Sequence, residues 1–282
     1  MDPRWTEGRA EAEAALGGDP LTCDAITADF RILQRRKGHR YSLDDLATAA
    51  EAVRAAGDAP ISRYLDLGCG IGSALLMVSW RLRPATVVGI EALDVSATLA
   101  RFNLRLNRLE ARLFEGDHRD VTAAWTEPPF DLVTGTPPYL PVGTALASPD
   151  PQRAAARLEL RGGIEDYLAS ADRVLAPGGH VVACAGGGDA ARVLGEGGRV
   201  VACAGGGDAA RVATGATAAD LHPYRRLDVI ARPYAKGPLF SVWSLRREAP
   251  KRFDHARLLV RGPDGKQTAE ARAMRATFGL ED

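Results

Sequence analysis

The chain has 282 residues, and its 36 Lys and Arg residues balance 36 Asp and Glu residues. A formal net charge of zero excludes a protein that coats a polyanion over its whole surface, so any contact with nucleic acid must be local. With 46% apolar and 26% charged residues, the composition is that of a globular protein and excludes the disordered and fibrous classes.

The sequence contains no sign of a membrane segment or a metal site. No stretch approaches the roughly 18 apolar residues of a membrane span, and the N-terminus carries acids instead of a basic segment followed by an apolar one. We therefore predict a cytoplasmic protein without a membrane partner. The four cysteines lie far apart with no CxxC pair, which predicts free thiols and no metal site. They are Cys23, Cys69, Cys184 and Cys203.

Residues 1–60 predict a helical and basic N-terminal segment. Its first 20 residues are rich in Ala, Glu and Gly and end in a Gly-Gly-Asp-Pro turn, which indicates a short helix or frayed arm. Ser42 can cap a helix over residues 42–56, whose first turn carries two acids that suit the helix dipole. A cluster of five positive charges precedes this helix. It consists of Arg31, Arg35, Arg36, Lys37 and Arg40.

Short apolar runs alternate with amphipathic stretches through the centre of the chain. The runs predict strands at 63–67, 86–91, 111–114 and 130–134, and the amphipathic stretches predict helices at 72–82 and 95–107. Alternation of this kind is typical of parallel βαβ units. We therefore expect an α/β fold with a doubly wound sheet.

A nearly perfect direct repeat follows within residues 178–215, at an offset of 19 residues. Residues 178–193 recur as 197–212, and the two copies differ only where His180 becomes Arg199. Each copy resembles a strand, a glycine-rich turn and a short helix, so we expect one copy in the main sheet and the other in a surface loop or edge strand. The glycines at 186–188 can also offer backbone N–H groups to a phosphate.

Two apolar runs near the C-terminus, 226–232 and 239–245, are joined by a connection short enough to make them an antiparallel pair. The tail beyond them is basic and ends in an Ala-rich helical stretch. The sequence therefore predicts three parts. They are the N-terminal segment at 1–60, a main domain at 61–247 and a basic, helical C-terminal appendage at 248–282.

The first strand of the main domain leads into a glycine turn and then a helix. This turn lies where doubly wound sheets bind cofactors, and its small residues let the backbone approach a ligand. Glu91 ends the second strand, where a carboxylate can accept both hydroxyl hydrogens of a ribose. The pyrophosphate fingerprint requires Gly or Ala at position 73, which is Ser here, so the pattern favours an adenosine-type cofactor without a pyrophosphate. The turn's predicted cofactor-binding residues are Asp66, Gly68, Gly70 and Gly72.

Two further features follow the third and fourth strands. Asp117 can accept a hydrogen bond from an adenine amino group, although an isolated Asp at such a place more often caps a helix. The segment 135–139 would lie beside the reactive methyl group of the cofactor, with prolines that stiffen the loop and a tyrosine ring on which a planar group can stack. A plain surface turn is the alternative. The residues predicted to hold the target are Thr136, Pro137, Pro138 and Tyr139.

The segments Asp66-Leu-Gly-Cys-Gly-Ile-Gly72 and Thr136-Pro-Pro-Tyr139 together resemble class I S-adenosylmethionine-dependent methyltransferases of the small-domain (MTS) group. These enzymes methylate planar nitrogen atoms of adenine, guanine or glutamine. Residues 34–44, and Ala176-Pro-Gly-Gly179, are most similar to bacterial tRNA(Val) adenine-N6 methyltransferases. The resemblance covers about residues 22–247 apart from one repeat copy. It implies S-adenosylmethionine as cofactor and a Rossmann-like, seven-stranded, mostly parallel sheet with an antiparallel last strand.

The target loop departs from the family pattern at its first residue. Enzymes of this group have Asn, Asp or Ser there, and the usual Asn accepts one amine hydrogen while the proline carbonyl accepts the other. Thr136 occupies this position, and its hydroxyl can accept a hydrogen bond but is shorter and is also a donor.

Three functions therefore stay open. The first is an N-methyltransferase acting on an adenine amino group in structured RNA such as tRNA, and the second is a protein (glutamine-type) or small-molecule methyltransferase of the same fold. The third is a cofactor-binding scaffold without catalysis. In the first case four basic residues are predicted to bind RNA phosphates, whereas a solvated charge run is the alternative explanation. These residues are Arg35, Arg36, Lys37 and Arg40.

Overall fold

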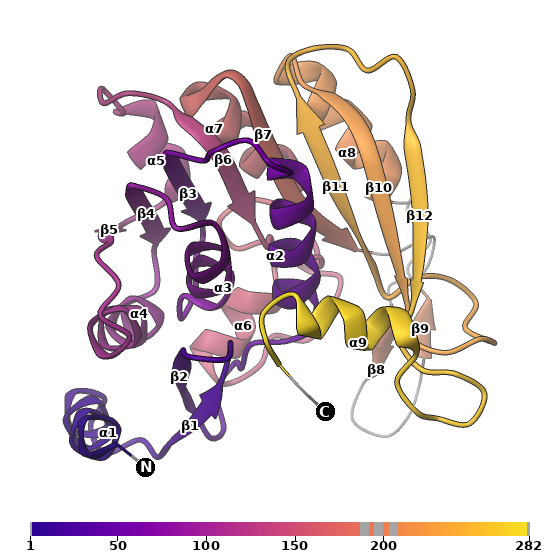
Figure 1. The fold of residues 1–282 in the computed structure, drawn as a ribbon. Helices are drawn as coiled ribbons and strands as arrows, with labels where there is room; N and C mark the ends of the chain where they lie inside the picture. Colours follow the sequence, from indigo (N-terminus) through magenta and orange to yellow (C-terminus); the bar gives the residue numbers. More distant parts are fainter. Residues whose placement is uncertain (1, 187–191, 195–199, 203–207, 281–282) are drawn as a thin grey trace.

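The structure is a computed structural model that describes residues 2–186, 192–194, 200–202 and 208–280. The strands of its main sheet are β3 (Arg63–Leu67), β4 (Thr86–Glu91), β5 (Arg112–Glu115), β6 (Phe130–Gly135), β7 (Leu175–Gly186), β10 (His222–Ile230), β11 (Phe240–Arg246) and β12 (Asp254–Leu259). They lie in the order β12-β10-β11-β7-β6-β3-β4-β5 (Figure 1). Only β11 runs antiparallel to its neighbours in this sheet. The predicted mostly parallel, doubly wound α/β fold is therefore confirmed, as is the antiparallel pair β10 and β11.

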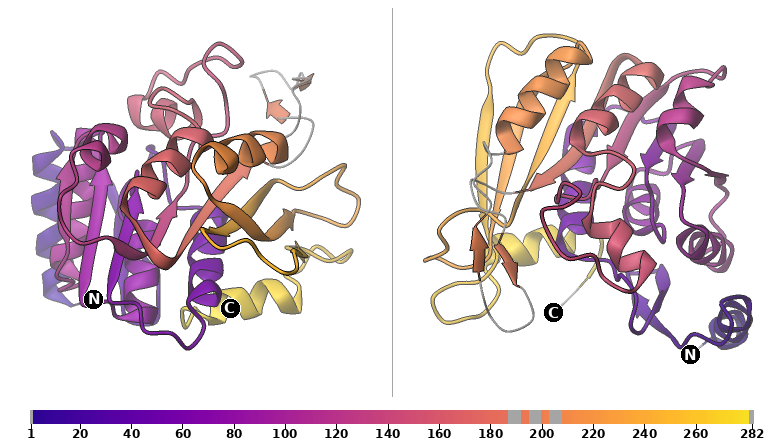
Figure 2. Two further views of the ribbon diagram at one scale, coloured as in Figure 1. Left: turned by 90° about the horizontal axis from the view of Figure 1, so that it is seen from above. Right: turned by 180° about the vertical axis from the view of Figure 1, so that it is seen from behind.

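The helices cover both faces of the sheet. They are α1 (Pro3–Ala15), α2 (Leu43–Ala56), α3 (Ser73–Leu82), α4 (Asp94–Leu106), α5 (His118–Ala123), α6 (Pro151–Arg157), α7 (Ile164–Val174), α8 (Asp208–Ala218) and α9 (Ala269–Ala276). Helices α2, α3 and α4 lie on one face, and α5, α7 and α8 lie on the other (Figures 1 and 2). Successive strand residues alternate between the two cores, as Tyr64 and Leu65 or Leu132 and Val133 do. This period of two explains why the central strands are apolar on both faces.

The eighth strand, β12, comes from the segment 248–282, which composition predicts as basic and helical. β12 adds parallel to β10 at the edge of the sheet. Polar side chains also connect the two strands. His255 Nε2 on β12 lies 2.8 Å from the Asp228 carboxylate on β10, and Arg225 on β10 bonds Asp254 on β12. An edge strand that is mostly exposed lacks a continuous apolar pattern, so composition does not reveal it.

The N-terminal segment contains a β-hairpin as well as helices. Strand β1 (Leu21–Ala25) pairs antiparallel with β2 (Arg31–Arg35), outside the main sheet. Asn103 of α4 and Asn107, the C-cap of this helix, bind the free edge of β2. Asn103 exchanges bonds of 2.7 and 3.1 Å with the backbone of Leu33, and Asn107 exchanges bonds of 3.0 and 2.7 Å with that of Arg31. These bonds hold the basic hairpin beside α4.

Helix α2 begins where the sequence predicts. Ser42 is its N-cap, and the Ser42 backbone N–H donates to the Asp45 carboxylate at 2.9 Å, which is half of a capping box. The acids of the first turn, Asp44 and Asp45, also face the ligand pocket described below. Capping therefore places two carboxylates at that pocket.

The repeat is built differently from the prediction that one whole copy joins the sheet. β7 comes from the first copy, whereas α8 comes from the second. Between them, β8 (Arg192–Leu194) pairs antiparallel with β9 (Val200–Ala202) outside the main sheet. The 19 extra residues thus separate a strand from its helix. The phosphate role considered for the glycines at 186–188 rests mostly on residues 187 and 188, which lie outside the described residues.

Deleting residues 187–205 should leave a folded chain, because Gly186 then continues into Gly206-Gly-Asp208, the same residues that follow it in the first copy. Both β7 and α8 keep their own sequence. We expect a single cooperative thermal unfolding transition, measured by circular dichroism.

Deleting residues 178–196 instead is the matched control. It replaces the first copy's strand with the second copy's and exchanges His180 for Arg199, which removes the 3.0 Å contact of His180 Nδ1 with the Tyr224 hydroxyl. This variant should also fold. Loss of cooperative unfolding in both deletions would show that the core needs both copies.

Candidate functional site

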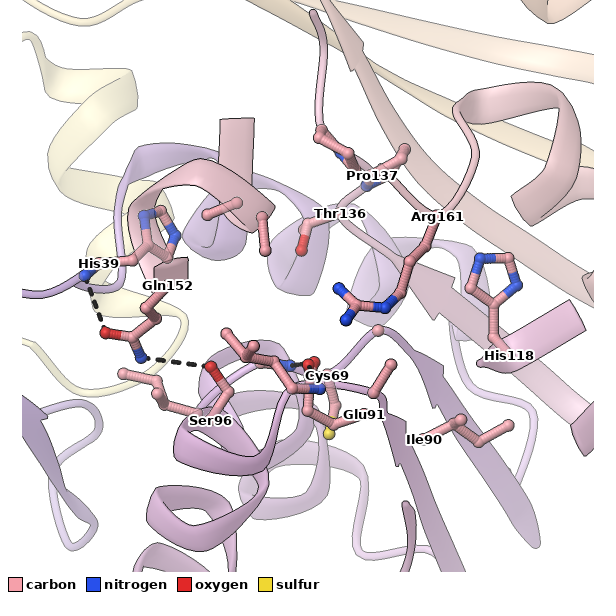
Figure 3. Close-up of a pocket in the computed structure, with 18 of the residues that line it drawn as sticks. His39, Cys69, Ile90, Glu91, Ser96, His118, Thr136, Pro137, Gln152 and Arg161 are labelled. Atoms are coloured by element: carbon pink, nitrogen blue, oxygen red, sulfur yellow. Dashed lines mark hydrogen bonds between the residues drawn. The ribbon is translucent and has the colours of Figure 1, made fainter. Parts of the chain in front are cut away.

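A pocket that is open to solvent lies at the carboxyl ends of β3, β4 and β6. This is the edge at which doubly wound sheets bind ligands. Figure 3 shows the target-loop residues Thr136 and Pro137 on one side of the pocket and Cys69 and Glu91 on the other. The structure thus brings the glycine turn and the target loop together. The predicted residues that line the pocket are Gly68, Gly70, Glu91, Thr136, Pro137, Pro138 and Tyr139.

The glycine turn leaves the backbone open toward this pocket. Gly68 and Gly70 have φ angles of +59° and +58°, a left-handed conformation that favours glycine. A Cβ atom at Gly68 would lie 2.2 Å from the Tyr167 hydroxyl, whereas one at Gly70 would meet no atom within 4 Å. Gly70 therefore leaves space for a ligand. Gly72 does not line the pocket and instead forms the left-handed N-cap of α3.

Glu91 is held in place by the glycine turn. One carboxylate oxygen accepts the Gly70 N–H at 2.8 Å, and the other accepts the Leu93 N–H at 2.7 Å. Each oxygen keeps a second lone pair for a ligand hydroxyl. Burial raises the pKa of Glu91, while the nearby charge of Arg161 acts in the opposite direction. The carboxylate is thus rigid and faces a place where a ribose could bind.

Asp66 lies beneath the glycine turn and is not among the pocket-lining residues. Its carboxylate accepts a 2.6 Å hydrogen bond from the Thr134 hydroxyl, whose oxygen lies 2.7 Å from the Tyr64 hydroxyl. Asp66 is 2% exposed, and burial raises its pKa to about 7. In this structure Asp66 therefore connects β3 to β6 and does not contact the pocket.

Asp117 caps a helix, which is the role that the sequence offered as the alternative to binding adenine. It caps α5 by accepting from the Arg119 N–H at 2.9 Å, and its two oxygens also accept from the Arg119 guanidinium at 2.9 and 2.7 Å. The bond to Arg119 lowers the pKa of Asp117. Its neighbours Gly116 and His118 line the pocket, but Asp117 does not.

The target loop is anchored at Tyr139. The Tyr139 hydroxyl donates to Asp44 at 2.8 Å and lies 3.1 Å from the Cys184 sulfur, and its ring stacks at 6.5 Å on Phe240. Burial raises the pKa of this hydroxyl. The predicted aromatic residue thus lines the pocket, but one side of its ring already faces Phe240. The Thr136 side chain stays at the pocket wall (Figure 3).

Helix α6 and the residues after it form one wall of the pocket. This wall was not predicted from the sequence. Gln152 is the main anchor: its amide donates to Ser96 at 3.2 Å and accepts from the His39 N–H at 3.0 Å (Figure 3). Beyond α6, Arg161 extends its guanidinium into the pocket. These residues follow no motif, so the sequence contains no signal for them.

His118 and Tyr167 also line the pocket and were not predicted from the sequence. Their rings lie 4.2 Å apart between centroids. His118 directly follows the Asp that the sequence singled out, which was the available signal. Tyr167 lies on the amphipathic helix α7, where an apolar face predicts only a core position.

Among the described residues, two of the four basic residues predicted to bind RNA form ion pairs. Arg35 bonds Asp19 at 2.5 Å and Asp150 at 2.9 Å, and Arg40 bonds Asp24 at 3.0 Å. Arg36 and Lys37 are exposed on the chain that leads from β2 to the pocket residue His39. Two of the four predicted phosphate contacts are therefore already engaged in ion pairs.

No helix among the described residues is long and apolar enough to cross a membrane. No group of three or more His, Cys, Asp or Glu side chains among them could hold a metal ion.

The proteins to which this chain is similar are methyltransferases. The family model described as methyltransferase small domain matches residues 41–185. A tRNA1(Val) (adenine(37)-N6)-methyltransferase of Aeromonas salmonicida is 38% identical over 122 residues, which are 42% of this chain and 49% of that protein. A 4-amino-L-phenylalanine/4-methylamino-L-phenylalanine methyltransferase of Streptomyces pristinaespiralis is 34% identical over 142 residues, 48% of this chain and 47% of that protein. The chain thus spans about half the length of these relatives.

Solved structures support the fold. The crystal structure of a predicted O-methyltransferase from Agrobacterium tumefaciens superposes with a TM-score of 0.56 at 16% identity, over 85% of this chain and 98% of that one. At this identity the likeness concerns the fold alone.

Asp66 should make stability depend on pH. Because burial raises its pKa from 3.8 to about 7, the folded chain keeps a proton that the unfolded chain loses above about pH 4. The free energy of unfolding should therefore fall as pH rises toward 7, by at most about 1.4 kcal/mol per pH unit. Asp66→Asn, which cannot ionise, should lack this decline in urea unfolding between pH 5 and 8. The exposed Asp58→Asn is the control, and an equal pH slope in wild type and Asp66→Asn would contradict the assignment.

Proposed function

We propose, from the premise that the chain belongs to the methyltransferase small domain family, that it is an S-adenosylmethionine-dependent N-methyltransferase. One observation carries the proposal: the Gly70–Glu91 arrangement and the target loop meet in a single pocket. Neither feature alone identifies a methyltransferase, since a glycine turn with an acid also binds other adenosine ligands.

The residues present fit the cofactor. The open backbone at Gly70 gives a ligand close access, and Glu91 keeps free lone pairs for the two ribose hydroxyls. When bound, S-adenosylmethionine supplies an electrophilic methyl group on sulfur. Residues of α6 and Arg161 form a further wall of this pocket.

The target loop would position a planar amine. The Thr136 hydroxyl can accept one amine hydrogen, and the Pro137 carbonyl can accept the other, which directs the nitrogen lone pair toward the methyl group. Prolines restrict the loop, and the bond from Tyr139 to Asp44 fixes its far end. Catalysis of this kind consists mainly of positioning, without a covalent intermediate on the enzyme.

The acceptor we propose is an adenine amino group in RNA. The Aeromonas relative is named for this reaction on tRNA, and the exposed charges of Arg36 and Lys37 lie close to the pocket. A cytoplasmic location of the chain stays a prediction, made from the lack of an apolar span and from the acids at the N-terminus.

A small-molecule amine is the second candidate acceptor. The Streptomyces relative is named for methylating an amino-acid derivative. Thr136 departs from the residue usual in the base-methylating loop, and Arg161 places a cation in the pocket where a substrate carboxylate could bind. The ion pairs of Arg35 and Arg40 also reduce the charge available to RNA.

Transfer of labelled methyl groups distinguishes these acceptors. The chain would be incubated with methyl-labelled S-adenosylmethionine and, separately, with total RNA, a protein extract and a low-molecular-mass extract. Label in adenine of RNA is the expected result. Label only in the small molecules would favour the second candidate, and cofactor binding without transfer to any of the three would favour a non-catalytic scaffold.

Glu91→Ala should weaken S-adenosylmethionine binding by about 10- to 100-fold, because it removes charge-assisted hydrogen bonds worth roughly 1.5 to 3 kcal/mol. Isothermal titration calorimetry measures the affinity, and thermal unfolding verifies that the variant is folded. The exposed Glu110→Ala is the control and should bind as the wild type does. Unchanged affinity in Glu91→Ala would refute the ribose role.

Replacing Arg36 and Lys37 by Gln should flatten the salt dependence of RNA binding. If both contact phosphates, the slope of log affinity against log salt should fall by about 1.4 to 1.8 units, at about 0.7 to 0.9 per contact. Arg81 and Arg83, exposed at the carboxyl end of α3 and hence at the opposite end of the strands, provide a control pair of equal charge. An unchanged slope, or no RNA binding by the wild type at low salt, would favour the small-molecule acceptor.

A further inference from the structure

The target loop borders two cavities. Its residues Pro137, Pro138 and Tyr139 line the ligand pocket and also a second, smaller cleft. The apolar core therefore does not support the loop on all sides. Two charged side chains, those of Glu159 and Arg211, form part of the wall of the second cleft.

Arg211, on α8, joins two carboxylates beside the second cleft. Its Nη1 and Nη2 atoms lie 2.6 and 3.1 Å from the two oxygens of Glu159, and its Nε and Nη2 atoms lie 2.7 and 2.6 Å from those of Glu165. Both contacts are bidentate, which is the strongest geometry between an arginine and a carboxylate. Glu159 is 11% exposed, so salt and water screen its contact with Arg211 only weakly. Arg211 thus compensates a carboxylate that is largely buried.

The backbone of Glu159 holds the end of the target loop. Its N–H donates at 2.9 Å to the carbonyl of Leu140, the residue that directly follows Tyr139, and the Leu140 N–H donates at 3.1 Å to the Arg157 carbonyl. The two segments thus form a short parallel bridge. Arg211 fixes the side chain of the same residue whose backbone fixes the loop. A movement of Arg211 would therefore reach the loop through Glu159.

The sequence leaves room for this ion pair at Gly163, the N-cap of α7. A Cβ atom at this position would lie 2.5 Å from Arg211 Nη2 and 2.8 Å from the Cδ atom of Glu159. A residue with a side chain would thus have to displace one of the two charged groups. Glycine at position 163 is therefore part of the arrangement that lets Arg211 approach Glu159.

We propose that Arg211 is a positioning residue for methyl transfer: it holds Glu159, and through Glu159 it keeps the target loop at the distance from the cofactor that the reaction requires. Arg211 is not among the residues that line the ligand pocket, so its role is positional and not catalytic. The inference rests on the proposed function, because it requires methyl transfer at this loop. A displacement of about 1 Å can lower the rate of a reaction that depends on positioning by about 100-fold.

The test compares two carboxylates that bond the same guanidinium. Of Glu159 and Glu165, Glu159 is the one whose backbone bonds the end of the target loop. The rate of methyl transfer is measured at saturating S-adenosylmethionine with the extract that accepts label, and calorimetry gives the affinity for S-adenosylhomocysteine. Glu159→Gln should lower the rate by about 10- to 100-fold and change this affinity by at most about twofold. Glu165→Gln is the matched control and should stay within about threefold of the wild-type rate, because Glu165 is partly exposed and Arg211 still bonds Glu159.

Changes of Arg211 itself extend the test. Arg211→Met removes the charge and should lower the rate as Glu159→Gln does. The double variant should be no slower than either single variant, because the two side chains act as one unit. Arg211→Lys keeps the charge without the planar fork and should recover part of the rate. Thermal unfolding verifies that each variant folds, and the comparison of Glu159→Gln with Glu165→Gln decides alone if Arg211→Met does not.

The outcomes distinguish this inference from the function on which it rests. A wild-type rate in Glu159→Gln, or an equal loss of rate in Glu159→Gln and Glu165→Gln, would overturn the inference and leave the methyltransferase proposal intact. A loss of S-adenosylhomocysteine affinity in Glu159→Gln as large as its loss of rate would also overturn it, because Glu159 would then shape the pocket as a whole. No transfer by the wild type to any of the three extracts would overturn both.

Discussion

The hydrogen bond from the Gly70 N–H to the Glu91 carboxylate joins the ends of two neighbouring parallel strands. It requires a left-handed residue at position 70, and it leaves the carboxylate facing the pocket. The same turn is tied to the N-terminal hairpin, because the Asn103 amide donates to both the Ile71 and Leu33 carbonyls. One short turn thus fixes the position of a carboxylate at the pocket and also holds the basic hairpin near it.

Three carboxylates with raised pKa lie in the pocket wall or next to it. Burial raises the pKa of Asp45, Asp66 and Glu91. Such groups are costly to ionise unless a positive charge lies near them. S-adenosylmethionine carries a sulfonium, so a bound cofactor would favour their ionised forms. Arg161, on the wall beyond α6, is a cation of the protein that already acts on Glu91.

The parts that could be predicted from sequence are those with regular patterns. Strands β3, β4, β6 and the pair β10 and β11 follow from apolar runs, and the positions of Gly70, Glu91 and the target loop follow from motif spacing. The edge strand β12 depends on polar pairs with β10, and the wall of the pocket depends on side chains such as Gln152 that make long-range bonds. Neither leaves a periodic signal. Asp117 caps α5 while its neighbour His118 lines the pocket, and this arrangement depends on a capping geometry that spacing does not specify.

The central claim is that this pocket binds a cofactor of the adenosylmethionine type and not a dinucleotide. Calorimetric titration of the full chain with S-adenosylhomocysteine and with NAD tests it most directly. The account predicts saturable binding of S-adenosylhomocysteine at one site per chain and much weaker or no binding of NAD. Tighter binding of NAD would contradict it.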